Sequence, residues 1–71
     1  MIPRTNEKVK TPFGEGICQG RYVETDFADV LVRITITEEN AHLLGSTKCL
    51  TPNANVSALF VFAESEVENV Q

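Results

Sequence analysis

Three carboxylates at alternate positions near the C-terminal end of the chain are the first candidates for chemistry. Glu64, Glu66 and Glu68 would project from one face if all three lay in a strand. A pair of carboxylates on one face could act as general acid and general base. Glu66 and Glu68 could instead face Lys8 and Lys10, if the first and last strands were neighbours. We favour this second interpretation, a cross-strand charge ladder that fixes the register and contributes about 0.2–1 kcal/mol for each exposed pair.

The other nucleophiles and metal ligands form no recognisable site. The Gly-Glu-Gly run at 14–16 lacks the further glycine and the lysine of a phosphate-binding loop, so we interpret it as a turn. His42 is the single histidine, and no serine lies in a nucleophile motif. Cys18 and Cys49 are far apart and belong to no metal-binding pattern, so we expect two free thiols. We therefore expect no catalytic residue, no cofactor and no metal, and we favour a non-enzymatic role.

The basic residues offer a weak nucleic-acid surface. Six lysines and arginines stand against ten aspartates and glutamates, which gives a formal net charge of −4. Affinity for a phosphate backbone depends on clustered cations. Lys8, Lys10, Arg21 and Arg33 could still gather into a local patch. Nucleic acid is thus a conceivable partner that the net charge disfavours.

The most informative segment lies near the C-terminal end and is apolar on both faces. Leu59 and Val61 alternate there with Phe60 and Phe62, whereas a small sheet has one interior to fill. The second face therefore needs a cover, either a helical turn expected at 38–44 or another copy or protein partner. We expect no membrane contact, since no apolar run is long enough to span a bilayer. The candidate apolar and aromatic binding surface consists of Leu31, Leu59, Phe60, Val61, Phe62 and Tyr22.

Short strands would position these residues. Strict alternation places Val30, Val32 and Ile34 on the buried face of one strand. Gly20, inside another run of strand-forming residues, predicts a bend or bulge. In a single domain of 71 residues, such strands predict an all-β, partly open barrel. The expected strands are 7–11, 17–24, 30–37, 56–62 and 66–70; we also expect a brief strand at 47–50, a helical turn at 38–44 that contains Leu43 and Leu44, a tight turn at 63–65, a polar turn at 25–29, and flexible residues 1–6.

Two segments resemble the small SH3-like barrels of the Tudor and KOW type. Residues 9–16 (Val-Lys-Thr-Pro-Phe-Gly-Glu-Gly) resemble the first strand and loop of such a barrel, and 59–70 resembles its closing strand, helical turn and last strand. Within this group the layout is nearest to the plasmid-encoded type II dihydrofolate reductases, on the spacing of Gly16, Gly20 and Tyr22. Those reductases bind folate and nicotinamide with a Val-Gln-Ile-Tyr run in a pore between four subunits. The corresponding stretch here is Leu-Phe-Val-Phe, so the resemblance implies the fold and self-association but not the activity.

We therefore expect a five-stranded SH3-like barrel that acts as a small non-catalytic binding or assembly module through an apolar or aromatic surface. We expect it to form a homo-oligomer or to bind a protein partner. A nucleic-acid-associated adaptor and an enzyme with its site at a multimer interface are the alternatives. The start of the chain lacks the pattern of a signal peptide, so a cytoplasmic location is expected. The chain could be a whole gene product of a phage or mobile element, or a domain of a longer protein.

Overall fold

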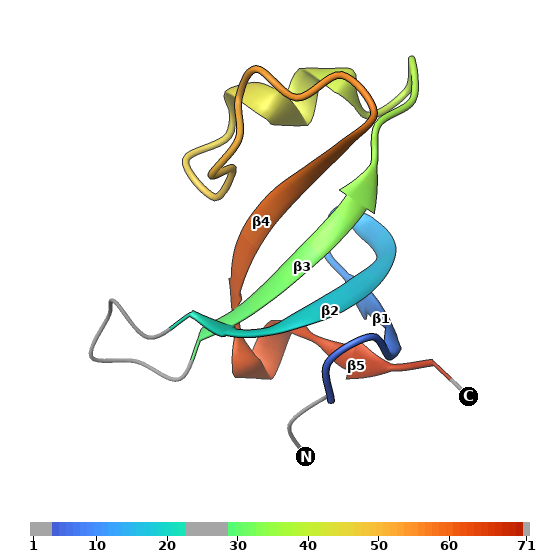
Figure 1. The fold of residues 1–71 in the computed structure, drawn as a ribbon, viewed down its shortest axis with the longest axis vertical. Coiled ribbons are helices and arrows are strands. Elements are labelled where there is room, and N and C mark those ends of the chain that lie inside the picture. The colour runs from blue at the N-terminus through green and yellow to red at the C-terminus, as the bar shows by residue number, and fades with distance from the viewer. Residues whose placement is uncertain (1–3, 23–28, 71) are drawn as a thin grey trace.

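The protein is a single antiparallel sheet of five strands in the order β4-β3-β2-β1-β5 (Figure 1). The structure is a computed structural model that describes residues 4–22 and 29–70. Its elements are β1 (Lys8–Thr11), β2 (Gly14–Tyr22), β3 (Asp29–Thr35), the 3-10 helix η1 (Ala41–Gly45), β4 (Ser57–Ala63), the 3-10 helix η2 (Glu64–Glu66) and β5 (Glu68–Asn69). The expected all-β class with five strands is confirmed for these residues, and the sheet is not closed into a complete barrel.

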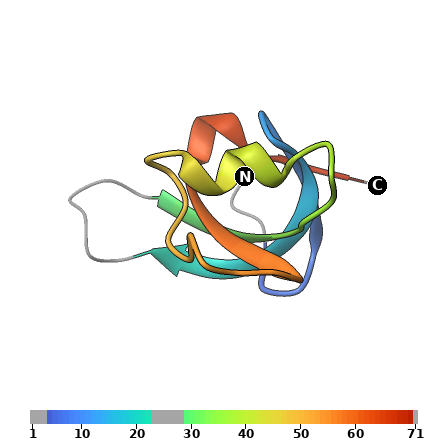
Figure 2. The same ribbon diagram turned by 90° about the horizontal axis from the view of Figure 1, so that it is seen from above.

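The sheet curls because its two edge strands are joined by very little chain. β4 and β5 lie at opposite edges, yet only residues 64–67 separate them. Five flat strands would span about 19 Å, whereas three 3-10 residues and two extended steps cover about 13 Å. The edges must therefore approach each other. Figure 2 shows the strands curving around one side, with η1 and η2 on the open side.

The core lies inside this curve and follows the predicted alternation. Val30, Val32 and Ile34 of β3 are buried, and residues between them face outward. β1 and β4 contribute in the same way, so that one face of each strand fills the interior. The complete buried set is Val9, Cys18, Val30, Val32, Ile34, Ala58, Phe60, Phe62 and Val67.

A bulge in β2 changes which side chains face outward. The pairing of β2 with β3 shifts between Cys18 and Gly20, and Gly20 has a φ of 120°. The predicted bulge at Gly20 is confirmed. Before it Ile17 lies on the outer face, and beyond it Arg21 lies opposite buried Val30, on the inner side.

The first hairpin places an aromatic ring over one end of the core. The Thr11 hydroxyl donates to the Gly14 carbonyl at 2.7 Å and accepts from the Phe13 amide at 3.1 Å. Gly14 then takes a φ of 109°, which a glycine adopts without strain. The Phe13 ring packs edge-on against Phe60 and Phe62, with centroids 5.5 and 5.3 Å away. The turn expected from the glycines is therefore also a core contact.

The segment between β3 and β4 also packs against the core, through Leu43 and Leu44. The helical turn expected at 38–44 is shorter and starts later, at Ala41. The Asn40 side chain fixes the loop that precedes η1. It accepts a hydrogen bond from the Thr37 amide at 2.7 Å and donates one to the Thr35 carbonyl at 2.9 Å. The glutamates at 38 and 39 thus precede the helix rather than form its first turn.

Residues 48–51 cover the outer edge of β4. The Val61 amide donates to the Lys48 carbonyl at 2.9 Å, and the Leu50 amide donates to the Leu59 carbonyl at 2.8 Å. Cys49 makes a single antiparallel bridge with Phe60, so the brief strand expected at 47–50 is reduced to one bridge. This covering leaves the β4 edge with little capacity to pair with another strand.

Some of the predicted segments lie outside the residues that the structure describes. The turn expected at 25–29 and the end of the strand expected at 17–24 lie largely outside the described residues. Residues 1–3 lie outside them too. Within the described part of the N-terminal segment, the Asn6 amide donates to the Cys18 carbonyl at 2.7 Å and the Glu7 amide to the Arg4 carbonyl at 3.1 Å.

Candidate functional site on the outer face of the sheet

The two faces of β4 have different environments. Phe60 and Phe62 are both 0% exposed and their rings stack 6.3 Å apart inside the core. The prediction that they belong to a binding surface is wrong, because the curl of the sheet turns them inward. Leu59 and Val61 lie on the other face and are only half-buried. Candidate binding residues on this strand are therefore limited to Leu59 and Val61.

The apolar strip is the outer surface formed by Leu31, Leu59 and Val61. Leu31 lies directly opposite Val61 on the neighbouring strand, and Leu59 is the next outward residue along β4. On the other side of Leu31 the register places Gly20, which carries no side chain. All three members of the apolar strip are half-buried. Adjacent strands thus bring together three apolar residues that are distant in the sequence.

The helical turn does not cover the apolar strip. Leu43 and Leu44 of η1 pack against the buried cluster, so they lie over the core rather than over the outer face. Exposed apolar residues border the strip instead. Leu50, beside Leu59 at the edge, is 41% exposed, and Ile17 of β2 is 36% exposed. The outer face therefore keeps a partly exposed apolar surface in the described part of the chain.

Tyr22 lies on this outer face as well. It pairs with Asp29, which is separated from Leu31 by one buried residue of β3 and so points to the same side. The tyrosine is half-buried. Of the predicted binding residues, the structure thus brings Leu31, Leu59, Val61 and Tyr22 to one face.

The four basic candidates do not form one patch. Lys8 and Arg33 both lie opposite Ile17, one on each neighbouring strand of the outer face. Lys10 lies on that face between two carboxylates, opposite Glu15 on one side and Glu68 on the other. The register therefore places an acid on each side of Lys10 and leaves Lys8 and Arg33 flanking an apolar residue.

Arg21 is separated from the other basic residues by the bulge. Its guanidinium lies 3.9 Å from the Glu64 carboxylate in η2, at the end of the open side of the sheet. Both side chains are well exposed, so solvent screens this pair. A nucleic-acid patch that includes Arg21 together with Lys8 and Arg33 is a wrong prediction.

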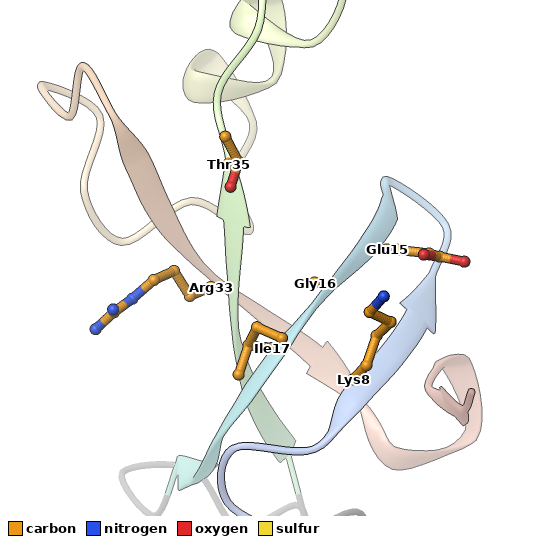
Figure 3. A pocket seen from close by; sticks show the side chains of 6 residues that line it. All are labelled: Lys8, Glu15, Gly16, Ile17, Arg33 and Thr35. Carbon is orange, nitrogen blue, oxygen red and sulfur yellow. The ribbon is translucent and has the colours of Figure 1, made fainter. Parts of the chain in front are cut away.

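A shallow depression of about 250 Å³ lies where β2 and β3 separate. The pairing of these strands starts at Ile17 with Arg33, so the residues before Ile17 and after Arg33 have no partner across this gap. Figure 3 shows the two strands diverging there, with Arg33 extending away from Lys8. Two cations and one carboxylate line the depression, which gives a local balance of +1. The lining residues are Lys8, Glu15, Gly16, Ile17, Arg33 and Thr35.

The C-terminal carboxylates have structural partners. Lys10 lies opposite Glu68, as the charge ladder predicted. Glu66 instead accepts a hydrogen bond from the Lys48 ammonium at 3.0 Å, so the prediction that it joins the ladder with Lys8 and Lys10 is wrong. The reason is η2, a turn of helix that moves Glu66 out of the strand. The three carboxylates therefore do not share one face.

Glu66 is held as a carboxylate by two donors. The Ala63 amide and the Lys48 ammonium both donate to its Oε1, each at 3.0 Å. The backbone hydrogen bond from Ala63, followed by the Lys48 hydrogen bond, lowers the pKa of Glu66 from its ordinary 4.5. The Lys48 ammonium also lies 5.4 Å from the centroid of the buried Phe62 ring. Lys48 therefore links residues 48–51, at the edge of β4, to η2 beside the core.

Few reactive groups converge among residues 4–22 and 29–70. They contain no cluster of three or more histidine, cysteine, aspartate or glutamate side chains that could hold a metal ion. Cys18 is buried and Cys49 half-buried, and the structure forms no disulfide between them. None of the described helices is long and apolar enough to cross a membrane. The apolar strip on the outer face is thus the main candidate for a functional site among the described residues.

Sequence reasoning missed Ile17 as a member of this face. The alternation along β2 is interrupted by the bulge, so its outward side could not be assigned from periodicity alone. Lys48 was missed in the same way, because its partner lies 18 residues further along the chain. Comparisons with protein-family models, curated proteins and solved structures found no match.

Proposed function

We propose that this chain is a non-catalytic binding and assembly module of the SH3-like barrel type that self-associates through the outer face of β3 and β4. The curled five-strand sheet, the pairing of β5 with β1 and the 3-10 turn between β4 and β5 support this assignment. The Thr-Pro-Phe-Gly hairpin and the conformation of Gly20 also agree with the resemblance. The proposal adds self-association as the role of that barrel.

The observation that carries the proposal is the apolar strip. Leu31 and Val61 lie side by side on the outer face, and η1 covers the core side instead. Apolar side chains that remain in water lose the stabilisation that burial would give, about 25 cal/mol for each Å². Exposed contiguous apolar surface on a small protein is typical of interaction sites. A second copy supplies the same strip, so each copy can bury that of the other.

A lysine substitution in the apolar strip tests the proposal. Val61→Lys places a charge at the centre of the strip, and we expect it to weaken self-association at least tenfold. Thr35→Lys is the matched control, because it adds the same charge at an exposed outer position of β3 outside the strip. Sedimentation velocity over 10 µM to 1 mM would compare both variants with the native chain. A native chain that stays at the monomer mass of 7.8 kDa throughout would overturn the proposal.

Nucleic-acid binding is the second candidate, and the depression is the observation in its favour. Lys8 and Arg33 flank Ile17 there, and neither forms an ion pair with another described residue. Its test is salt-dependent binding of single-stranded DNA or RNA, lost in a Lys8→Glu variant. The net charge of −4 makes the apolar strip the stronger candidate.

A further inference from the structure

The outward residues of β3 carry opposite charges at equal distances from an apolar centre. Asp29, Leu31 and Arg33 occupy successive outward positions, separated by the buried Val30 and Val32. Their order is acid, apolar, base. Reversing the direction of such a strand exchanges the positions of the two charges while the leucine stays in place. This pattern is therefore complementary to itself when two copies face each other with antiparallel β3 strands.

We infer that two copies pack outer face to outer face about a two-fold axis. The axis lies between the two sheets and passes directly over Leu31 of β3. This inference rests on the proposed self-association and adds its geometry. The axis runs across the strands, so that each strand lies over its own counterpart with reversed direction. Arg33 of each copy then faces Asp29 of the other, which gives two equivalent charge pairs. Sheets commonly pack face to face with nearly aligned strands, so this arrangement needs no unusual crossing angle.

The neighbouring strands fit the same symmetry. On β4, Val61 lies opposite Leu31 and therefore meets its own counterpart at the axis. One step along β4 on either side, Leu59 of one copy meets Ala63 of the other, a large residue against a small one. Such large and small pairs can interdigitate without a cavity. The apolar strip is thereby covered by an identical apolar strip.

On β2, the symmetry joins the remaining apolar and aromatic residues of the face. Gly20 lies opposite Leu31, so two side-chain-free positions meet at the axis and allow close approach. Ile17 lies opposite Arg33, and Tyr22 lies opposite Asp29. The rotation that brings Arg33 over Asp29 also brings Ile17 over Tyr22. Burial of the 36% exposed Ile17 against an aromatic ring would then stabilise the pair of copies.

Charge-reversed single variants test this geometry by complementation. Arg33→Asp leaves two acids on β3, and Asp29→Arg leaves two bases. Each variant alone would place like charges opposite each other at both pairs, and we expect its self-association to weaken at least tenfold. An equimolar mixture restores both pairs, because the two acids of one copy face the two bases of the other. We expect the mixture to associate within threefold of the native affinity.

General charge attraction cannot produce this result. From −4, Arg33→Asp changes the net charge by −2 to −6, and Asp29→Arg changes it by +2 to −2, so both partners stay acidic. Arg4→Asp is the matched control, since Arg4 is exposed outside the sheet and its replacement also gives −6. Because it keeps Asp29 and Arg33, Arg4→Asp should self-associate with close to the native affinity, whereas Arg33→Asp at the same net charge should not. Circular dichroism would establish that each variant is folded.

The possible outcomes separate the two proposals. A native chain that associates, together with a mixture no tighter than its components, would overturn the two-fold geometry and leave self-association in place. A strictly monomeric native chain would overturn both. Weakening of Arg4→Asp to the level of Arg33→Asp would also overturn the geometry, because the loss would then follow the net charge and not position 33.

Discussion

A Cβ on Gly16 would come within 2.6 Å of the Arg33 carbonyl oxygen, so β2 crosses β3 there too closely for any residue with a side chain. Val32 and Ile34 would also be approached, at 2.7 and 2.8 Å. The close crossing allows β2 to leave β3 and continue beside β1. The depression on the outer face opens at this point, where the two strands begin to diverge.

Replacing Gly16 with alanine should destabilise the fold by at least about 1–3 kcal/mol, because the backbone at Arg33 cannot yield as a flexible side chain would. Urea unfolding followed by circular dichroism would measure the change. Gly45→Ala is the control, since nothing lies within 4 Å of a Cβ at that position. Equal effects at the two positions would show that the close crossing is absent.

At Gly14, unlike Gly16, a substitution should be destabilising because of the backbone conformation and not because of a steric clash. A Cβ there would meet nothing within 4 Å, yet the φ of 109° disfavours any other residue. Gly14→Ala should therefore cost about 1–2 kcal/mol. The same urea titration would measure this loss, and a neutral result would mean that the Thr11 to Gly14 turn adopts another conformation.

The Thr51 hydroxyl is predicted to protect the edge of β4. It accepts from the Leu59 amide at 3.0 Å in a part-buried position. Thr51→Val keeps the shape of the side chain but removes this acceptor, and we expect a loss of about 1–3 kcal/mol. Thr51→Ser keeps the hydroxyl and should retain most of the stability. Faster hydrogen exchange of the Leu59 amide in Thr51→Val alone would identify the cause.

Glu66 should make stability depend on pH in the acid range. Its pKa is lower in the folded protein than the ordinary 4.5, so folding favours the carboxylate. The stabilisation is therefore present above pH 4.5 and is lost as the pH falls through the lowered folded value. Solvent screening keeps it modest, within about 1 kcal/mol.

Glu66→Gln tests this dependence, because the glutamine amide does not titrate in this pH range, whereas the glutamate carboxylate gains a proton in acid. Thermal unfolding between pH 2.5 and 7 should show a smaller loss of stability in acid for Glu66→Gln than for the native chain. Glu39→Gln removes an exposed carboxylate that pairs with no described cation, and it serves as the control. Identical profiles for the native chain and Glu66→Gln would contradict the role given to the contact with Lys48.

The strands were predictable from local patterns, and their long-range contacts were not. The alternation of Val30, Val32 and Ile34 requires only the two-residue period of a strand, and Gly20 marks its bulge by composition. Neither pattern specifies that residues 48–51 cover the β4 edge. Lys48 therefore could not be identified as the partner of Glu66. Long-range pairings of this kind depend on the whole curl of the sheet.

The outer face, too, was predictable in its local pattern but not in its long-range contacts. Leu59 and Val61 were correctly separated from Phe60 and Phe62 by alternation, but the alternation does not say which side faces the core. The structure resolves this, because the edge strands β4 and β5 are joined closely enough to turn the two phenylalanines inward. The contributions of Ile17 and Arg33 to the same face became visible only when the register across the bulge was known.

The central claim, association through the outer face, is tested most directly by amide chemical shifts measured at increasing protein concentration. The account predicts concentration-dependent shifts at Leu31, Leu59 and Val61 and at flanking Ile17, with little change at Phe13 or in η1. The Val61→Lys variant should remove these shifts. Shifts confined to η1 or to the first hairpin, or spectra that do not change up to 1 mM, would contradict it.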